Sequence, residues 1–252
     1  MEVIFKFKKI SGVPLIECYI PGVTYRGIIF VNHGYTSKKE TETSYCLELA
    51  KKNYFVIAID AYKHGERIQE PYISGSEIEK FEDFFNVIIQ TGNDIKKIYN
   101  DNYKERFDMI NLLGISMGGA VSYYTATIME NINAVIPIIG SPSFYEFSKF
   151  KIDRMDKSDD DIRGMSLKIE ELKIVDPINR PELFLNKKMF ILNGNEDSIV
   201  PEKWSKRLYE KIIKLAEERK IKTNIKFKSY KVGHNVTIDM KKELYDWCEK
   251  NI

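Results

Sequence analysis

The stretch NLLGISMGGA (residues 111–120) places a serine between two glycines, directly after a run of aliphatic residues. If the aliphatic run ends a strand and residues 117–131 form a helix, Ser116 lies in the tight turn between them. Side chains two positions to either side would collide in such a turn, and Gly114 and Gly118 have none. The pattern therefore predicts a turn that presents the Ser116 hydroxyl at the carboxyl end of a sheet, beside a helix N-terminus. The alternative is a glycine-rich turn that holds a serine incidentally.

Short aliphatic runs recur along the rest of the chain and alternate with segments of helical period. The expected strands are residues 3–9, 13–20, 27–33, 54–60, 108–115, 134–140, 188–194 and 225–232. The expected helices are residues 38–52, 76–100, 117–131, 201–219 and 235–251. The central strands are densely apolar, as buried parallel strands are, whereas the first two and the last alternate between apolar and polar residues. We therefore predict an α/β fold with a mostly parallel, eight-stranded sheet, helices on both faces, and an antiparallel hairpin at the N-terminus.

The chain has 252 residues, of which 43% are hydrophobic, so it can bury one sizeable core. We expect residues 1–252 to form a single domain. From about residue 141 to residue 187 there is no dense strand, the charge density is high, and an aromatic cluster opens the segment. An insertion of this length indicates either a functional lid or a disordered segment. The helical period of residues 166–174 favours a small helical cap.

Composition limits the partners and the compartment. Lysine and arginine total 39 against 37 acidic residues, and a net charge of +2 favours neither nucleic acid nor an anionic membrane surface. Three scattered cysteines, Cys18, Cys46 and Cys248, cannot form a disulfide framework and favour a reducing compartment. The N-terminus lacks the apolar core of a signal peptide, and no window approaches the roughly 18 apolar residues of a membrane span. We therefore expect a soluble, cytoplasmic protein with no membrane partner.

A serine hydroxyl becomes a nucleophile when a histidine removes its proton and a carboxylate orients that histidine. The sequence contains three histidines: His33, His64 and His234. His234 follows the last expected strand, so it should lie at the same end of the sheet as Ser116. Asp197 follows the expected strand 188–194 and is the candidate acid, with its neighbour Glu196 as the alternative. The order serine, aspartate, histidine along the chain is typical of one class of hydrolase folds.

The end of the third expected strand is a candidate oxyanion hole. The segment VNHGYTS places a glycine after His33, which lets the backbone turn so that the N–H of Tyr35 can point towards an oxyanion. The second donor would be the N–H of Met117. We expect His33 itself to be structural, with a role in proton transfer as the alternative.

The third histidine, His64, lies in the segment DAYKHGER after the fourth expected strand. We interpret Asp60, His64 and Arg67 as a network that braces this loop, and a direct part in substrate binding is the alternative. The histidines lie in separate loops, and the chain has neither an H-E-x-x-H motif nor paired cysteine spacing. We therefore expect no metal and no cofactor.

Five stretches together resemble the α/β-hydrolase superfamily: HGYTSKKE, DAYKHGER, GISMGG, GNEDSIVP and VGH. Within it, the sequence is similar to the small esterases that are close to prolyl-oligopeptidase catalytic domains and to cinnamoyl or feruloyl esterases. The resemblance covers about residue 13 to residue 251 and implies the α/β-hydrolase fold. It also implies the roles of nucleophile, acid, base and the two oxyanion-hole amides for Ser116, Asp197, His234, Tyr35 and Met117. The sequence shows no propeller domain beside these motifs, which argues against oligopeptidase activity.

These residues predict an enzyme that cleaves small-molecule carboxylic esters, in which the ester acylates Ser116 and water releases the acyl group. Two alternatives stay open. The same triad can cleave amides or thioesters, because leaving-group preference depends on pocket shape, and a hydrolase fold can also serve as a non-catalytic binding module. Five aromatic residues are candidates for the substrate pocket, although we favour core packing for them: Tyr72, Phe144, Tyr145, Phe147 and Phe150.

Overall fold

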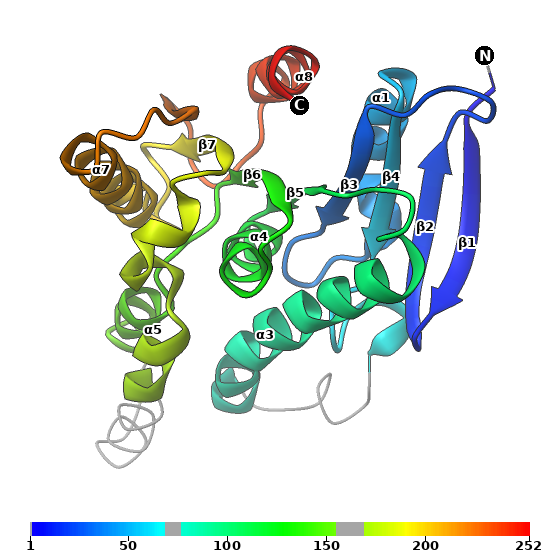
Figure 1. The fold of residues 1–252 in the computed structure, drawn as a ribbon. Helices are drawn as coiled ribbons and strands as arrows, with labels where there is room; N and C mark the ends of the chain where they lie inside the picture. Colours follow the sequence, from blue (N-terminus) through cyan, green and yellow to red (C-terminus); the bar gives the residue numbers. More distant parts are fainter. Residues whose placement is uncertain (1, 69–76, 155–168) are drawn as a thin grey trace.

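The computed structural model describes residues 2–68, 77–154 and 169–252 (Figure 1). Within these residues, eight strands form one sheet in the order β1-β2-β4-β3-β5-β6-β7-β8. The strands are β1 (Ile4–Ile10), β2 (Val13–Tyr19), β3 (Gly27–Asn32), β4 (Tyr54–Ile59), β5 (Ile110–Ile115), β6 (Ile132–Ile138), β7 (Lys188–Gly194) and β8 (Ile225–Tyr230). The helices are α1 (Thr43–Lys51), α3 (Glu77–Asn102), α4 (Met117–Ile128), α5 (Phe144–Ile152), α7 (Lys203–Glu218) and α8 (Ile238–Asn251). Short 3₁₀ turns are η1 (Lys39–Glu42), η2 (Gly65–Arg67), η3 (Pro177–Asn179) and η4 (Pro181–Phe184).

The sheet is parallel from β4 through β8 and antiparallel at its N-terminal edge. β1 pairs with β2, and β2 with β4, in antiparallel register, whereas β4, β3, β5, β6, β7 and β8 run parallel. The register places Asn32 of β3 beside Gly114 of β5, and Gly114 beside Pro137 of β6. The carboxyl ends of the central strands are therefore level with one another. The predicted α/β class and the antiparallel hairpin are confirmed.

Helices cover both faces of the sheet (Figure 1). On one face, α1 and α8 bury residues such as Leu49 and Leu244 against the strands. On the other face, α3, α4 and α7 bury residues such as Ile95, Val121 and Leu208, and α5 extends the same core. Burial of both faces explains why the central strands are apolar along their whole length. No helix in the described part of the chain is long and apolar enough to cross a membrane.

Most boundaries fall within three residues of those expected, and the connection between α4 and β6 shows why some differ. Helix α4 ends at Ile128 because Met129 has extended backbone angles (φ −131°, ψ 135°). Strand β6 then begins at Ile132 and ends at Ile138, so it lies two residues earlier than expected at each end. Ile139 ends the strand because its φ of 47° is incompatible with extended pairing. Such backbone angles cannot be inferred from the hydrophobic pattern of the sequence.

The predicted cap region, residues 141–187, contains α5 and a second helical stretch at residues 169–175. Part of it, residues 155–168, lies outside the described residues. The start of α5 is held by the buried Asp176, whose carboxylate accepts hydrogen bonds from the N–H groups of Phe144 (2.8 Å) and Tyr145 (3.2 Å). Burial raises the pKa of this carboxyl group to about 6. The contact anchors α5 beside the carboxyl end of β6.

Candidate active site

Ser116 occupies the turn between β5 and α4, where its φ of 55° and ψ of −114° are values that L residues rarely adopt. A Cβ atom on Gly114 would lie closer than 3.0 Å to the backbone of Gly118. A Cβ atom on Gly118 would lie equally close to the carbonyl oxygen of Asn32 at the end of β3. The Ser116 N–H donates to the carbonyl oxygen of Ile138 in β6 (2.8 Å). Neighbouring strands thus hold the strained turn in place, and glycine is required on both sides of it.

The Ser116 side chain belongs to a hydrogen-bonded chain of three groups. Its Oγ lies 2.9 Å from Nε2 of His234, and Nδ1 of His234 lies 2.7 Å from Oδ2 of Asp197. His234 is in the loop between β8 and α8, and Asp197 is in the loop between β7 and α7. Both loops and the Ser116 turn leave the carboxyl ends of parallel strands, which is why residues far apart in the sequence converge here. The three residues singled out in the sequence lie together.

Backbone contacts join the two loops that carry the aspartate and the histidine. The N–H of Asn195 donates to the carbonyl oxygen of Tyr230 (2.9 Å), and the N–H of Glu196 donates to that of Val232 (3.1 Å). A Cβ atom on Gly194 would lie closer than 3.0 Å to the Val232 carbonyl oxygen, so this glycine permits the close approach. Glu196 is exposed, whereas the aspartate beside it is buried and contacts the histidine. The loop turns Asp197 inward and Glu196 outward, so Asp197 rather than Glu196 contacts His234.

Asp197 is positioned by its own loop. Its side chain is 1% exposed, and Oδ1 accepts hydrogen bonds from the N–H groups of Ile199 and Val200, both at 2.9 Å. The second oxygen, Oδ2, is then directed at His234. A carboxylate at Oδ2 requires the histidine proton on Nδ1, which leaves Nε2 able to accept a proton from Ser116. The hydrogen bonds therefore select the tautomer that can act as a base.

The two amides expected to form an oxyanion hole lie beside Ser116. A Cβ atom on Gly34 would lie 3.7 Å from Cβ of Ser116, so the loop after β3 runs next to the serine. Tyr35 and Met117 line the same cavity as Ser116. Across the described residues, neither of their N–H groups donates a backbone hydrogen bond outside regular elements. Met117 also begins α4, where unpaired N–H groups favour negative charge.

His33 is a buried structural residue, as expected. It is 1% exposed, and its Nε2 accepts a hydrogen bond from the N–H of Ala61 (3.0 Å). The proton must therefore be on Nδ1, which donates to the carbonyl oxygen of Gly34 (2.7 Å). Burial lowers the pKa of His33 to about 4, so the ring stays neutral near pH 7. It joins the loop after β3 to the loop after β4.

The loop after β4 is braced by Asp60, as expected. Asp60 is fully buried and accepts hydrogen bonds from the N–H and Nζ groups of Lys39, both at 2.9 Å, and from the N–H of Glu66 (3.0 Å). Arg67 donates to the Asp60 carbonyl oxygen (3.1 Å). A Cβ atom on Gly65 would collide with the Asp60 carboxylate, which explains the glycine after the histidine. Sequence reasoning missed Lys39, because nothing in its local sequence distinguishes it from an exposed lysine.

His64 packs against Tyr35 in the loop after β3. It is 3% exposed, and its Nδ1 lies 2.9 Å from the carbonyl oxygen of Tyr62. The ring meets Tyr35 edge-on at a centroid distance of 5.4 Å and lies 5.6 Å from the ring of His33. Burial lowers its pKa, as it does for His33. Both histidines therefore support the position of Tyr35.

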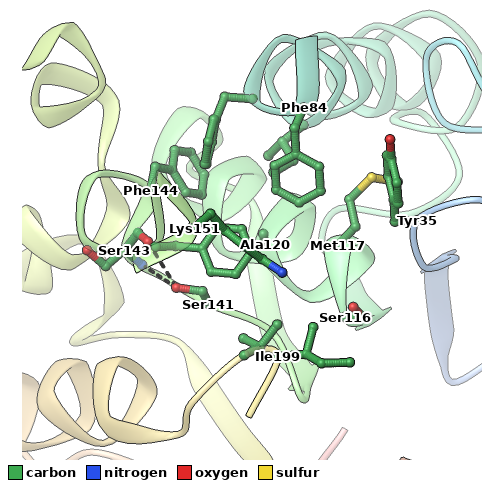
Figure 2. Close-up of a pocket in the computed structure, with 14 residues that line it drawn as sticks. Tyr35, Phe84, Ser116, Met117, Ala120, Ser141, Ser143, Phe144, Lys151 and Ile199 are labelled. Carbon is green, nitrogen blue, oxygen red and sulfur yellow. Dashed lines mark hydrogen bonds between the residues drawn. The ribbon is translucent and has the colours of Figure 1, made fainter. Parts of the chain in front are cut away.

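A cavity of about 430 Å³ opens beside Ser116 (Figure 2). Its walls come from α3, α4, α5 and the loops after β3, β6 and β7. The residues that line it are Tyr35, Phe84, Phe85, Ile88, Ser116, Met117, Ala120, Ser141, Ser143, Phe144, Phe147, Lys151, Ile199 and Val200. The volume falls in the range of small-molecule sites, and the lining is mostly apolar.

The aromatic candidates for this pocket separate into two groups. Phe144 and Phe147 line the cavity and are also buried in the core, so the two roles considered for them coincide. Tyr145 and Phe150 are not part of the lining. The Tyr145 ring lies 4.1 Å from Nζ of Lys173, and the Phe150 ring packs against Trp204 at a centroid distance of 5.4 Å. Tyr72 lies outside the described residues. Among the residues that are described, no cluster of His, Cys, Asp and Glu side chains could hold a metal ion.

Comparison with solved structures supports the topology derived above. The structure of TT1662 from Thermus thermophilus is similar with a TM-score of 0.76 and 19% sequence identity, over 99% of this chain and 98% of that one. The Pyrococcus furiosus esterase Pf2001 is similar with a TM-score of 0.67 and 17% identity, over 99% of this chain and 92% of that one. The chain has the α/β-hydrolase fold. The fold implied by the sequence motifs is therefore confirmed.

Sequence comparison adds one similar protein to these α/β-hydrolase structures. "Putative esterase YitV" of Bacillus subtilis (strain 168) is 26% identical over 213 residues, which cover 81% of this chain and 82% of that protein. No family model matches the chain. The loops that carry Ser116, Asp197 and His234 therefore converge within an α/β-hydrolase fold.

Proposed function

We propose that this protein is a serine hydrolase that cleaves small-molecule carboxylic esters through an acyl-enzyme intermediate. The observation that carries the proposal is the continuous hydrogen-bonded chain from Ser116 through His234 to Asp197, with distances of 2.9 and 2.7 Å. The names of YitV and Pf2001, both described as esterases, favour esters as the substrate class. Ser116, Asp197 and His234 each follow a parallel strand of the same sheet, and this shared support favours a fixed arrangement of the three groups.

In the proposed mechanism, Ser116 Oγ attacks the ester carbonyl carbon while Nε2 of His234 takes its proton. The carboxylate of Asp197 stabilises the imidazolium that forms, and the N–H groups of Tyr35 and Met117 donate to the oxyanion. His234 then returns the proton to the leaving alcohol. Water attacks the acyl-enzyme by the same route and releases the acid, which regenerates the free serine.

The lining of the cavity indicates which half of the ester it receives. Ser116, Tyr35 and Met117 belong to the lining, whereas His234 does not. The leaving oxygen must face His234, because that imidazole protonates it. The alcohol therefore leaves on the histidine side, and the acyl group occupies the cavity. An acyl chain of moderate length fits an apolar space of about 430 Å³.

We further propose that residues 1–252 act as one domain, in which α5 and residues 169–175 form a cap over the acyl site. The placement of Phe144 and Phe147 in the cavity wall supports this role for α5. We also keep the cytoplasm as the proposed location. The cysteines Cys18, Cys46 and Cys248 are buried and unpaired, as expected in a reducing compartment.

The test combines labelling with turnover. A fluorophosphonate should label the parent at Ser116, and 4-nitrophenyl acetate and butyrate should release 4-nitrophenol with a burst that matches the enzyme concentration. Ser116→Ala should abolish labelling and lower kcat by a factor of about 10³ or more. A folded parent that releases no phenol and leaves Ser116 unlabelled would refute the proposal.

A further inference from the structure

A lysine lies in the wall of the mostly apolar acyl cavity. Lys151 belongs to the last turn of α5, and it is the one charged residue among the described residues that line the cavity. Figure 2 shows its side chain lying across the pocket, with the nitrogen directed towards the side where Met117 and Ser116 lie. The walls around it are aromatic and aliphatic. A positive charge therefore faces the space into which the acyl group enters.

The half-buried Lys151 differs from Lys39, which is the buried lysine among the described residues. Lys39 is paired with the fully buried carboxylate of Asp60. Among the described residues, Nζ of Lys151 makes no hydrogen bond and no ion pair, and it lies 5.5 Å from the centroid of the Phe147 ring. Lys149, on the same helix, is exposed instead. Within residues 2–68, 77–154 and 169–252, no acidic side chain pairs with Lys151, so its ammonium can contact a molecule in the cavity.

Burial and neighbouring charges act on the Lys151 ammonium in opposite directions. Burial lowers the pKa of its ammonium group, the positive charge of Arg154 lowers it as well, and the negative charge of Asp197 raises it. An anionic group bound beside Lys151 would replace the water that burial removes.

We infer that the preferred substrates are esters whose acyl group joins an apolar chain to a terminal carboxylate, and that Lys151 binds this carboxylate. The inference rests on the proposed function, because it assumes that the acyl group occupies the cavity. The aromatic wall around Phe144 and Phe147 contacts the apolar chain, and Lys151 binds the carboxylate at its end. Hydrolysis of such a monoester consumes one water and yields a dicarboxylic acid and an alcohol.

The experiment compares esters that differ in one terminal group. The substrates are the 4-nitrophenyl monoesters of succinic, glutaric and adipic acids, each paired with the neutral ester of equal acyl length, and spontaneous hydrolysis is subtracted. For the best pair, the parent should show a higher kcat/KM for the anionic ester. Lys151→Met should lower the ratio of anionic to neutral kcat/KM about tenfold, the effect of one lost charge-assisted hydrogen bond. Lys151→Arg should largely retain the ratio.

The matched control is Lys149→Met, which removes an equal charge from the exposed side of the same helix and should leave the ratio unchanged. Activity on the neutral esters reports that each variant is folded. If the parent favours the neutral ester at every length, or if Lys151→Met leaves the ratio unchanged, the inference is wrong while ester hydrolysis stands. If the folded parent cleaves none of the esters, the proposed function itself fails.

Discussion

Replacement of Asp197 by asparagine tests the proposed triad without changing its shape. The asparagine Oδ1 should keep the hydrogen bonds from the N–H groups of Ile199 and Val200, both 2.9 Å in the parent. Its NH₂ group then takes the position of Oδ2, 2.7 Å from Nδ1 of His234. Two donors cannot share this contact, so the histidine proton moves to Nε2. Nε2 then donates to Ser116 Oγ, 2.9 Å away, and can no longer remove its proton.

The expected result is a fall in kcat/KM by a factor of about 10³–10⁴, which is about 4–5.5 kcal/mol of activation free energy. The free energy of unfolding should change by less than about 2 kcal/mol, because each group keeps a hydrogen-bond partner. The assay is hydrolysis of 4-nitrophenyl butyrate, with urea unfolding as the check on the fold. Glu196→Gln is the matched control, and it should retain parental activity because Glu196 is exposed. An Asp197→Asn variant within tenfold of the parent would refute the reasoning.

Three further predictions concern the fold and the cavity. Gly118→Ala should lower the free energy of unfolding by about 3 kcal/mol or more, because the new Cβ would meet a backbone carbonyl of β3, and an unchanged urea midpoint would contradict this. Burial lowers the pKa of His33 from 6.5 to about 4, so between these pH values the unfolded chain binds a proton that the folded chain does not. As the pH falls through this window, the free energy of unfolding of the parent should therefore fall by about 3 kcal/mol relative to that of His33→Gln. If the two proteins show parallel profiles of stability against pH, this prediction is wrong. Phe147→Ala should shift the preferred acyl chain towards longer esters while changing turnover of the acetate ester less, and equal losses across a chain-length series would exclude the proposed acyl site.

Much of the fold could be predicted because both faces of the sheet are buried. Every strand from β3 to β7 then needs apolar residues on both sides, which leaves dense runs that the sequence displays directly. The turn at Ser116 could also be predicted from the sequence, because backbone contacts within the turn and with β3 require glycine at positions 114 and 118. The end of β6 could not be predicted from the sequence, because it depends on a single backbone angle at Ile139.

The site was less predictable wherever it depends on packing between distant elements. Phe84 and Phe85 line the cavity, but their helical period indicates only that one face of α3 is buried, and not against which neighbours. Lys151 has the same limitation, because the sequence does not show which face of α5 turns towards the serine. Asp197 and Glu196 are adjacent in sequence, so the choice between them rested on the direction of a loop.

The backbone contacts between the loops after β7 and β8 have a consequence for the biogenesis of this protein. Ser116 precedes His234 by 118 residues, and the histidine loop takes its position only where it meets the loop that carries Asp197. A nascent chain that stops before β8 contains Ser116, the proposed nucleophile, without His234, the proposed base. The proposed hydrolysis of esters should therefore begin only once the last strand has docked, and the chain should be inactive during its translation.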